Sequence, residues 1–159
     1  MDDTAWMTAE EPGRMLALAG DRLSHAQLRR FALDCVRDIA PYLTDERTRR
    51  AFAAAEAFAD GRVGADELER ARVPADEFFS DSCIYGTSTG DHAARAAALV
   101  AAPDPVNVGL ICYCCTVAWC FQATNGYKAG EVAMQAARSE ILLRQCDRLR
   151  GLLIARRPG

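Results

Sequence analysis

Residues 106–123 read VNVGLICYCCTVAWCFQA and carry no charged side chain. Apolar residues surround the whole helical wheel of this stretch, whereas a surface helix carries them on one side only. The stretch approaches the length of a membrane span. However, Asn107, Thr116, Gln122 and three clustered cysteines interrupt it, and no basic residue flanks it closely. We therefore expect a fully buried helix over residues 106–123 and no membrane-spanning segment.

The clearest amphipathic helix is predicted over residues 24–39. Ser24 and Gln27 have capping-box spacing. Apolar residues then recur at i, i+3, i+4, i+7, i+8 and i+11, which is the pattern of one helical face. They are Leu28, Phe31, Ala32, Cys35, Val36 and Ile39. Charged residues, Arg29 and Asp38 among them, are expected on the opposite, solvated face.

Shorter helices are expected on either side of these two elements, at residues 8–19, 44–60, 65–72 and 91–102. Thr8, Thr44 and Asp91 occupy their cap positions, and Pro74 is expected to end the third of them. A long helix over residues 127–154 closes the chain.

No segment alternates apolar and polar residues in the manner of a strand. The sequence therefore predicts an all-α fold, a single-domain helical bundle over residues 1–159 in which amphipathic helices shield the apolar one. The composition agrees, because half of the 159 residues are hydrophobic and 26% are charged. The net charge of −3 argues against a nucleic-acid binder. Residues 1–4 are acidic where an export signal would be basic, so we expect a cytoplasmic protein.

The chain has seven cysteines, and a reducing compartment argues against a disulfide framework. Most of them are expected to be small buried hydrophobic residues. On the 106–123 helix, Cys112, Cys115 and Cys120 fall on one broad face, and Cys146 or Cys35 could approach from another helix. Thiolates bind Cu(I) or Zn(II). A thiol-rich metal-binding bundle with Cys112, Cys115, Cys120 and Cys146 as ligands is therefore one alternative function.

The segment 79–91 is predicted to be a loop insertion, rich in hydroxyl groups and glycines. It leads into a helix N-terminus that can bind an anion, but it lacks the Gly-Lys-Ser/Thr ending of a P-loop. The segment and the residue after it contain a thiol, a carboxylate and an imidazole, at Cys83, Asp91 and His92. These are the groups of an activated thiolate, so a small enzyme using the 79–92 loop is a second alternative. A solvated surface loop has the same composition.

The runs RFALDCVR (residues 30–37), LTDERTRRA (43–51) and QCDRLR (145–150) resemble an uncharacterised bacterial all-helical family with large planctomycete paralogue sets. The resemblance covers residues 6–70 and part of the last helix, and the chain departs from it between about 78 and 122. It implies a helical, cytoplasmic protein and no particular chemistry. No catalytic constellation is complete, so we expect a non-catalytic helical interaction or accessory protein that binds a protein partner. The alternative of a homo-oligomer stays open.

Overall fold

The computed structural model describes residues 5–82 and 88–154, and within these ranges the chain forms seven α-helices and no strand. The helices are α1 (Pro12–Ala19), α2 (His25–Ile39), α3 (Glu46–Ala59), α4 (Ala65–Ser82), α5 (Thr89–Val100), α6 (Val108–Ala123) and α7 (Glu131–Ile154), with short 3-10 turns at Gly20–Arg22 and Ala40–Tyr42. The predicted all-α, single-domain bundle is confirmed.

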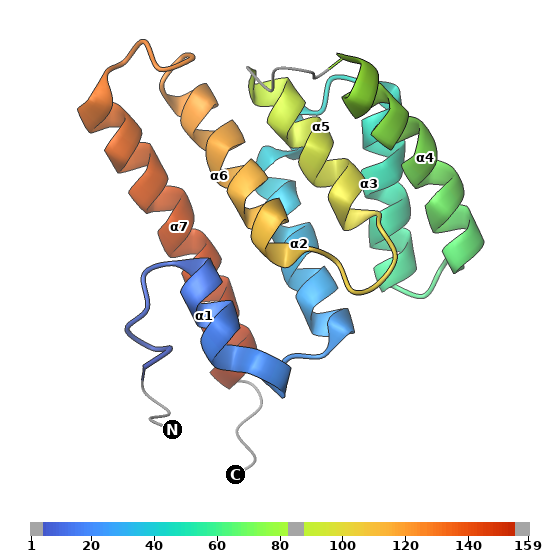
Figure 1. Cartoon of the computed structure of the whole chain (residues 1–159), viewed down its shortest axis with the longest axis horizontal. Coiled ribbons are helices and arrows are strands. Elements are labelled where there is room, and N and C mark those ends of the chain that lie inside the picture. Colours follow the sequence, from blue (N-terminus) through green and yellow to red (C-terminus); the bar gives the residue numbers. More distant parts are fainter. Residues whose placement is uncertain (1–4, 83–87, 155–159) are drawn as a thin grey trace.

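The helices are arranged side by side, with α7 at one edge and α4 at the other (Figure 1). Between them, α6 packs against α5 and α2 on one side and against α7 on the other, and α3 joins this core to α4. The short helix α1 lies across one end of the bundle, where it contacts α7 and α6. The apolar helix α6 is therefore central, and α7 is an outer helix.

Helix α6 is buried on several sides, but the predicted full burial is wrong at Tyr113, which is 58% exposed. Ile111 has no exposed surface, and Cys120, which points about 180° from it around the helix, is 4% exposed. The helix begins at Val108, because the Asn107 carboxamide oxygen accepts a hydrogen bond from the Leu110 N–H at 3.0 Å. None of the helices in the described ranges has the length and hydropathy that a bilayer crossing requires.

Helix α2 has the predicted capping box between Ser24 and Gln27. However, the periodicity predicts the wrong position for one of its charged residues. Arg29 was expected on the solvated face, and its side chain is 2% exposed. Its guanidinium donates hydrogen bonds to the carbonyls of Val100 and Ala102, at 2.7 and 2.8 Å, and to the Asp104 carboxylate at 2.9 Å. Arg29 thus satisfies carbonyl groups left free where α5 ends.

Several helix starts differ from the predictions. Thr8 does not cap α1, since its hydroxyl donates to the Ala5 carbonyl and the helix starts at Pro12. Asp45, not Thr44, caps α3 by accepting the Arg47 N–H at 2.8 Å. Helix α7 begins at Glu131, four residues later than predicted. Left-handed backbone conformations before it form the connecting turn, at Asn125, Gly126, Tyr127 and Gly130.

The predicted end at Pro74 is wrong, because α4 continues through this proline to Ser82. Proline removes one helical hydrogen bond, and packing of the fully buried Ala75 against the core compensates for it. The predicted loop therefore starts after residue 82. Its residues 83–87 lie outside the described ranges, and α5 starts before Asp91, which is its third residue and not its cap.

Candidate functional site

The largest surface hollows described adjoin each other along α7. One, of about 300 Å³, lies between the start of α1, α6 and α7, and the other, of about 420 Å³, lies between the segment before α1 and α7. Both are lined by Glu11 and Leu142, so they are neighbours, and we call the two hollows together the α7 groove. Its other lining residues are Glu10, Pro12, Gly13, Gly109, Cys112, Tyr113, Thr116, Arg138, Ser139, Leu143, Gln145, Cys146 and Arg150.

Helical spacing places these residues on facing surfaces of α6 and α7. On α7, Arg138, Leu142 and Gln145 stand at i, i+4 and i+7. They face a second such series on α6, which includes Cys112 and Thr116. The buried Gln145 amide joins the two helices by donating to the Cys112 carbonyl at 3.3 Å and to the Thr116 hydroxyl at 3.5 Å. The floor of the groove is therefore a fixed helix–helix contact.

Arg150 builds the remaining wall of the groove. Its guanidinium donates to the carbonyls of Met7 and Ala9, at 3.1 and 2.7 Å, and to the Asp147 carboxylate at 2.6 Å. These bonds hold the segment before α1 against α7, where Trp6 is 5% exposed and anchors the segment in the core. The groove thus depends on contacts between residues more than 140 positions apart.

The groove combines apolar surface with charges of both signs at its rim. Within residues 5–82 and 88–154, Glu11 and Arg138 form no ion pair, although both line the groove. Tyr113 and Leu143 are each 58% exposed at its edges. Its other polar groups are three hydroxyls, a carboxamide and two buried thiols, from Tyr113, Thr116, Ser139, Gln145, Cys112 and Cys146. Such a surface can bind a partner.

The structure distributes the predicted metal ligands over several places. Cys112 and Cys146 lie at the floor of the groove, while Cys115 and Cys120 are buried elsewhere along α6. Cys35 does approach the apolar helix, where its thiol is hydrogen-bonded to that of Cys112. Nowhere in the described ranges are three or more His, Cys, Asp or Glu residues arranged to hold a metal ion. The predicted set is therefore not gathered into one site.

Burial also raises the pKa of several thiols of the chain. Desolvation raises the pKa of the Cys114 thiol to about 11 and that of Cys115 well above its ordinary value. The hydrogen bond with Cys112, together with burial, raises the pKa of Cys35. Cys35, Cys114 and Cys115 are all buried, as most of the cysteines were expected to be.

The second predicted site, the 79–92 loop, is described only in part. Cys83 lies outside the described residues. The Asp91 carboxylate accepts the Ser88 N–H at 3.0 Å, and the Ser88 hydroxyl accepts the Asp91 N–H at 3.1 Å, which forms the capping box of α5. The His92 ring stacks on Phe121 with ring centroids 5.9 Å apart. The structure thus gives Asp91 a role in starting a helix.

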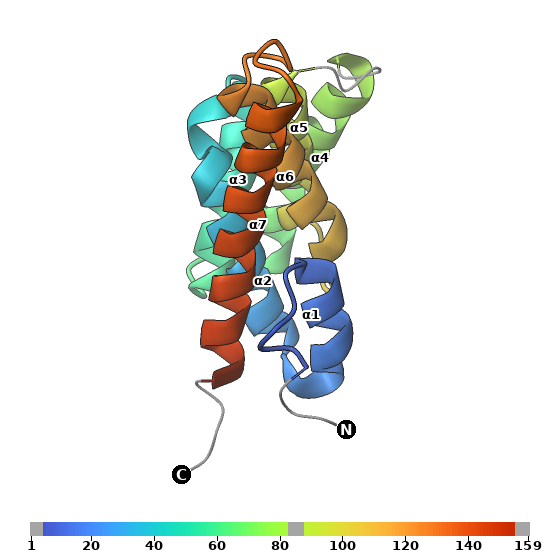
Figure 2. The ribbon, with the colours of Figure 1, turned by 90° about the vertical axis from the view of Figure 1, so that its left-hand side faces the viewer.

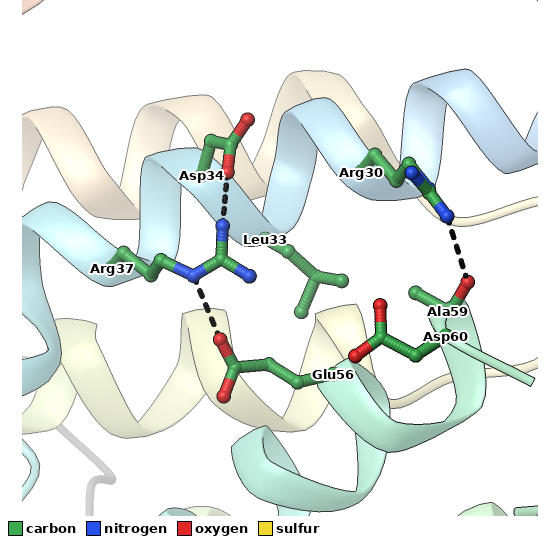
Figure 3. Close-up of a pocket in the computed structure, with 7 residues that line it drawn as sticks. All are labelled: Arg30, Leu33, Asp34, Arg37, Glu56, Ala59 and Asp60. Carbon is green, nitrogen blue, oxygen red and sulfur yellow. Dashed lines mark hydrogen bonds and ion pairs between the residues drawn. The ribbon is translucent and has the colours of Figure 1, made fainter. Parts of the chain in front are cut away.

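A smaller charged pocket of about 170 Å³ separates α2 from α3 (Figure 3). Arg37 bridges it by donating to the Glu56 carboxylate at 2.7 Å and to Asp34 on its own helix. Arg30 donates to the Ala59 carbonyl at 3.4 Å. Arg37 and Arg30 therefore link α2 to α3 across this pocket.

Of the residues that line the α7 groove, only Cys112 and Cys146 were among the predicted site residues. One sequence signal could have found part of it, since Val132, Leu143 and Ile154 recur every 11 residues, a spacing that keeps them on one helical face. Compared with family models, curated proteins and solved structures, the chain matches none. The resemblance to the planctomycete family stays a prediction, and the function is argued from the groove.

Proposed function

We propose that the chain is a non-catalytic helical interaction protein that binds a protein partner through the α7 groove. The observation that carries this proposal is the continuity of the groove with exposed apolar side chains. Tyr113 and Leu143, each 58% exposed, stand at its edges, and Met7, 47% exposed, belongs to the segment that forms its wall. Apolar side chains grouped around a hollow are typical of protein interaction sites.

The charges around the groove suit a protein surface better than a small substrate. Glu10 and Glu11 are near one wall, and Arg138 is on the other helix. A polar rim with both signs around an apolar centre is the usual composition of a protein–protein interface. Neither alternative function has a comparable observation in its favour, so the metal-binding bundle and the small enzyme stay predictions.

A photo-crosslinking experiment in cells tests this function. Benzoylphenylalanine replaces Tyr113 in the groove or, as a control, the exposed Glu67 on α4 at the opposite edge of the bundle. We expect a covalent protein adduct from position 113 and none from position 67. Adding Leu142→Glu, which places a charge in both hollows, should abolish the adduct. An adduct that forms equally from both positions, or that survives Leu142→Glu, or no adduct at all, would overturn the proposal.

A further inference from the structure

The smaller hollow of the α7 groove contains the N-terminus of α1. It is lined by Glu11, Pro12 and Gly13, which are the residue before this helix and its first two residues. Figure 2 shows that α1 begins beside the middle of α7 and runs toward the end of the bundle where α7 ends. No side chain caps α1, and a proline has no N–H. The N–H groups of Gly13 and Arg14 therefore have no partner within the helix.

Two features of this hollow favour a negatively charged group. The free N–H groups at a helix N-terminus attract carboxylates and phosphates. Arg138 of α7 lines the same hollow, and its guanidinium makes no ion pair and no hydrogen bond within residues 5–82 and 88–154. A guanidinium binds a carboxylate through two parallel hydrogen bonds. The approach to Gly13 is open, since a Cβ added there would meet no atom within 4 Å.

The floor of the hollow has an acceptor that lacks a donor. Gln145 has no exposed surface, and its Nε2 donates to the Cys112 carbonyl and the Thr116 hydroxyl. Its Oε1 has no hydrogen-bond partner among the described residues. A buried acceptor without a partner lowers stability, and an N–H of a ligand would satisfy it. The last residue of a peptide provides this N–H next to its carboxylate, whereas a phosphate or a simple carboxylate ion provides none.

The rim of the hollow favours a peptide that carries a positive charge before its end. Glu11 lines both hollows and Glu10 lines the larger one, and neither forms an ion pair in the described part of the chain. They would repel a carboxylate that arrives alone, but a basic side chain near the carboxylate would pair with them. Leu142 lines both hollows and offers an apolar surface to the last side chain.

We infer that the smaller hollow binds the carboxyl terminus of the partner protein, with the terminal carboxylate between Arg138 and the N-terminus of α1. The N–H of the last residue donates to Gln145 Oε1, its apolar side chain contacts Leu142, and a basic residue just before it pairs with Glu11. Free backbone N–H groups are a recurring means of recognising a peptide end. The inference rests on the proposed function and names the chemistry of its partner.

Isothermal titration calorimetry of the purified full chain with synthetic peptides tests this inference. The probe is acetyl-Ala-Ala-Lys-Ala-Leu with a free carboxyl terminus, and its matched control is the same peptide ending in a carboxamide. We expect the free acid to bind about tenfold or more tightly than the amide, because the amide loses the charge-assisted hydrogen bonds. Equal binding of acid and amide, or no binding of either, would overturn the inference.

Variants of the protein separate recognition from a structural effect. Arg138→Met should weaken the binding of the free acid about tenfold and leave that of the amide unchanged, whereas a structural defect would weaken both alike. Glu11→Gln should weaken the lysine peptide about twofold to fivefold, and should not weaken a peptide with Ala in place of Lys. Arg50→Met, at an exposed arginine of α3, is the control and should bind all the peptides like the wild type.

The photo-crosslink at position 113 keeps the two proposals distinguishable. If that position still forms a protein adduct while the acid and amide peptides bind equally or not at all, the carboxyl-terminal inference is overturned and the proposed function stands. An Arg138→Met variant that retains the preference for the free acid would also overturn the inference. Circular dichroism verifies that each variant folds.

Discussion

Arg148 on α7 donates two hydrogen bonds to the Asp38 carboxylate on α2, at 2.6 and 2.8 Å. Asp38 is 13% exposed and Arg148 is 32% exposed, so the pair is partly withdrawn from water. The carboxylate raises the pKa of Arg148, which therefore remains charged at every pH at which the protein folds. Because α7 carries the groove, this pair fixes the helix that we propose as the interaction surface.

Removing Asp38 should loosen that attachment. We expect Asp38→Ala to lower the free energy of unfolding by about 1.5–3 kcal/mol, since a partly buried charge-assisted bond is lost and Arg148 is left without its partner. Urea denaturation at neutral pH measures the change. Asp34→Ala is the matched control on the same helix, because Asp34 is 45% exposed and surface pairs contribute little. Similar small losses for both variants would contradict the role given to this pair.

Arg29 is expected to be essential for the junction between α5 and α6. Arg29→Met keeps the length of the side chain but leaves the Val100 and Ala102 carbonyls and the Asp104 carboxylate without their donor. We expect this variant to lower the free energy of unfolding by about 3–5 kcal/mol, as other broken buried ion pairs do. Thermal and urea unfolding give the value. Arg50→Met, at a 74% exposed arginine on α3, should unfold almost like the wild type.

The buried thiols predict slow labelling and a loss of stability at alkaline pH. With a pKa of about 11, roughly one Cys114 thiol in a thousand is ionised at pH 8, so a disulfide reagent should label it mainly after unfolding. In the unfolded chain the thiols ionise near pH 8.5. The pKa values of these thiols are higher in the folded protein than in the unfolded chain. Their contribution to the free energy of unfolding is therefore complete below about pH 8.5 and is lost as the pH rises above it.

Unfolding free energies measured at pH 8 and pH 10 check this sign. Each such thiol should contribute a decrease of up to about 1.4 kcal/mol per pH unit in this range. Cys114→Ala should make the decrease shallower, and Cys83→Ser in both proteins removes the thiol outside the described residues. Rapid labelling of the native protein at pH 8, or stability that increases toward pH 10, would contradict the burial of these side chains.

Trp119 gives a test of how α6 meets α7. The Arg144 guanidinium lies 4.7 Å from the centre of its ring, and the indole N–H is buried without a partner in the described part of the chain. Trp119→Phe removes that unpartnered donor along with some packing, so we expect it to lower the free energy of unfolding by about 1 kcal/mol. Trp119→Ala should lower the free energy of unfolding by about 3 kcal/mol or more. Chemical denaturation distinguishes them, and equal losses would show that the ring contributes nothing.

The sequence alone determined the helical class and the central position of α6. These features follow from periodicity and hydropathy, which are properties of neighbouring residues. The capping box of Ser24 and Gln27 was predictable for the same reason, because all of its atoms belong to one helical turn.

Only the tertiary structure decided where Arg29, Asp38 and Arg148 lie and that a groove exists. A charged residue is buried when distant segments supply its partners, and the acceptors of Arg29 come from residues more than 70 positions away. The groove likewise forms where Arg150 holds the segment before α1 against α7. Local spacing placed Cys112 and Cys115 on one helix, but whether thiols gather into a metal site depends on how separate helices pack. That packing is set by the whole core and cannot be deduced from the residues of any one helix.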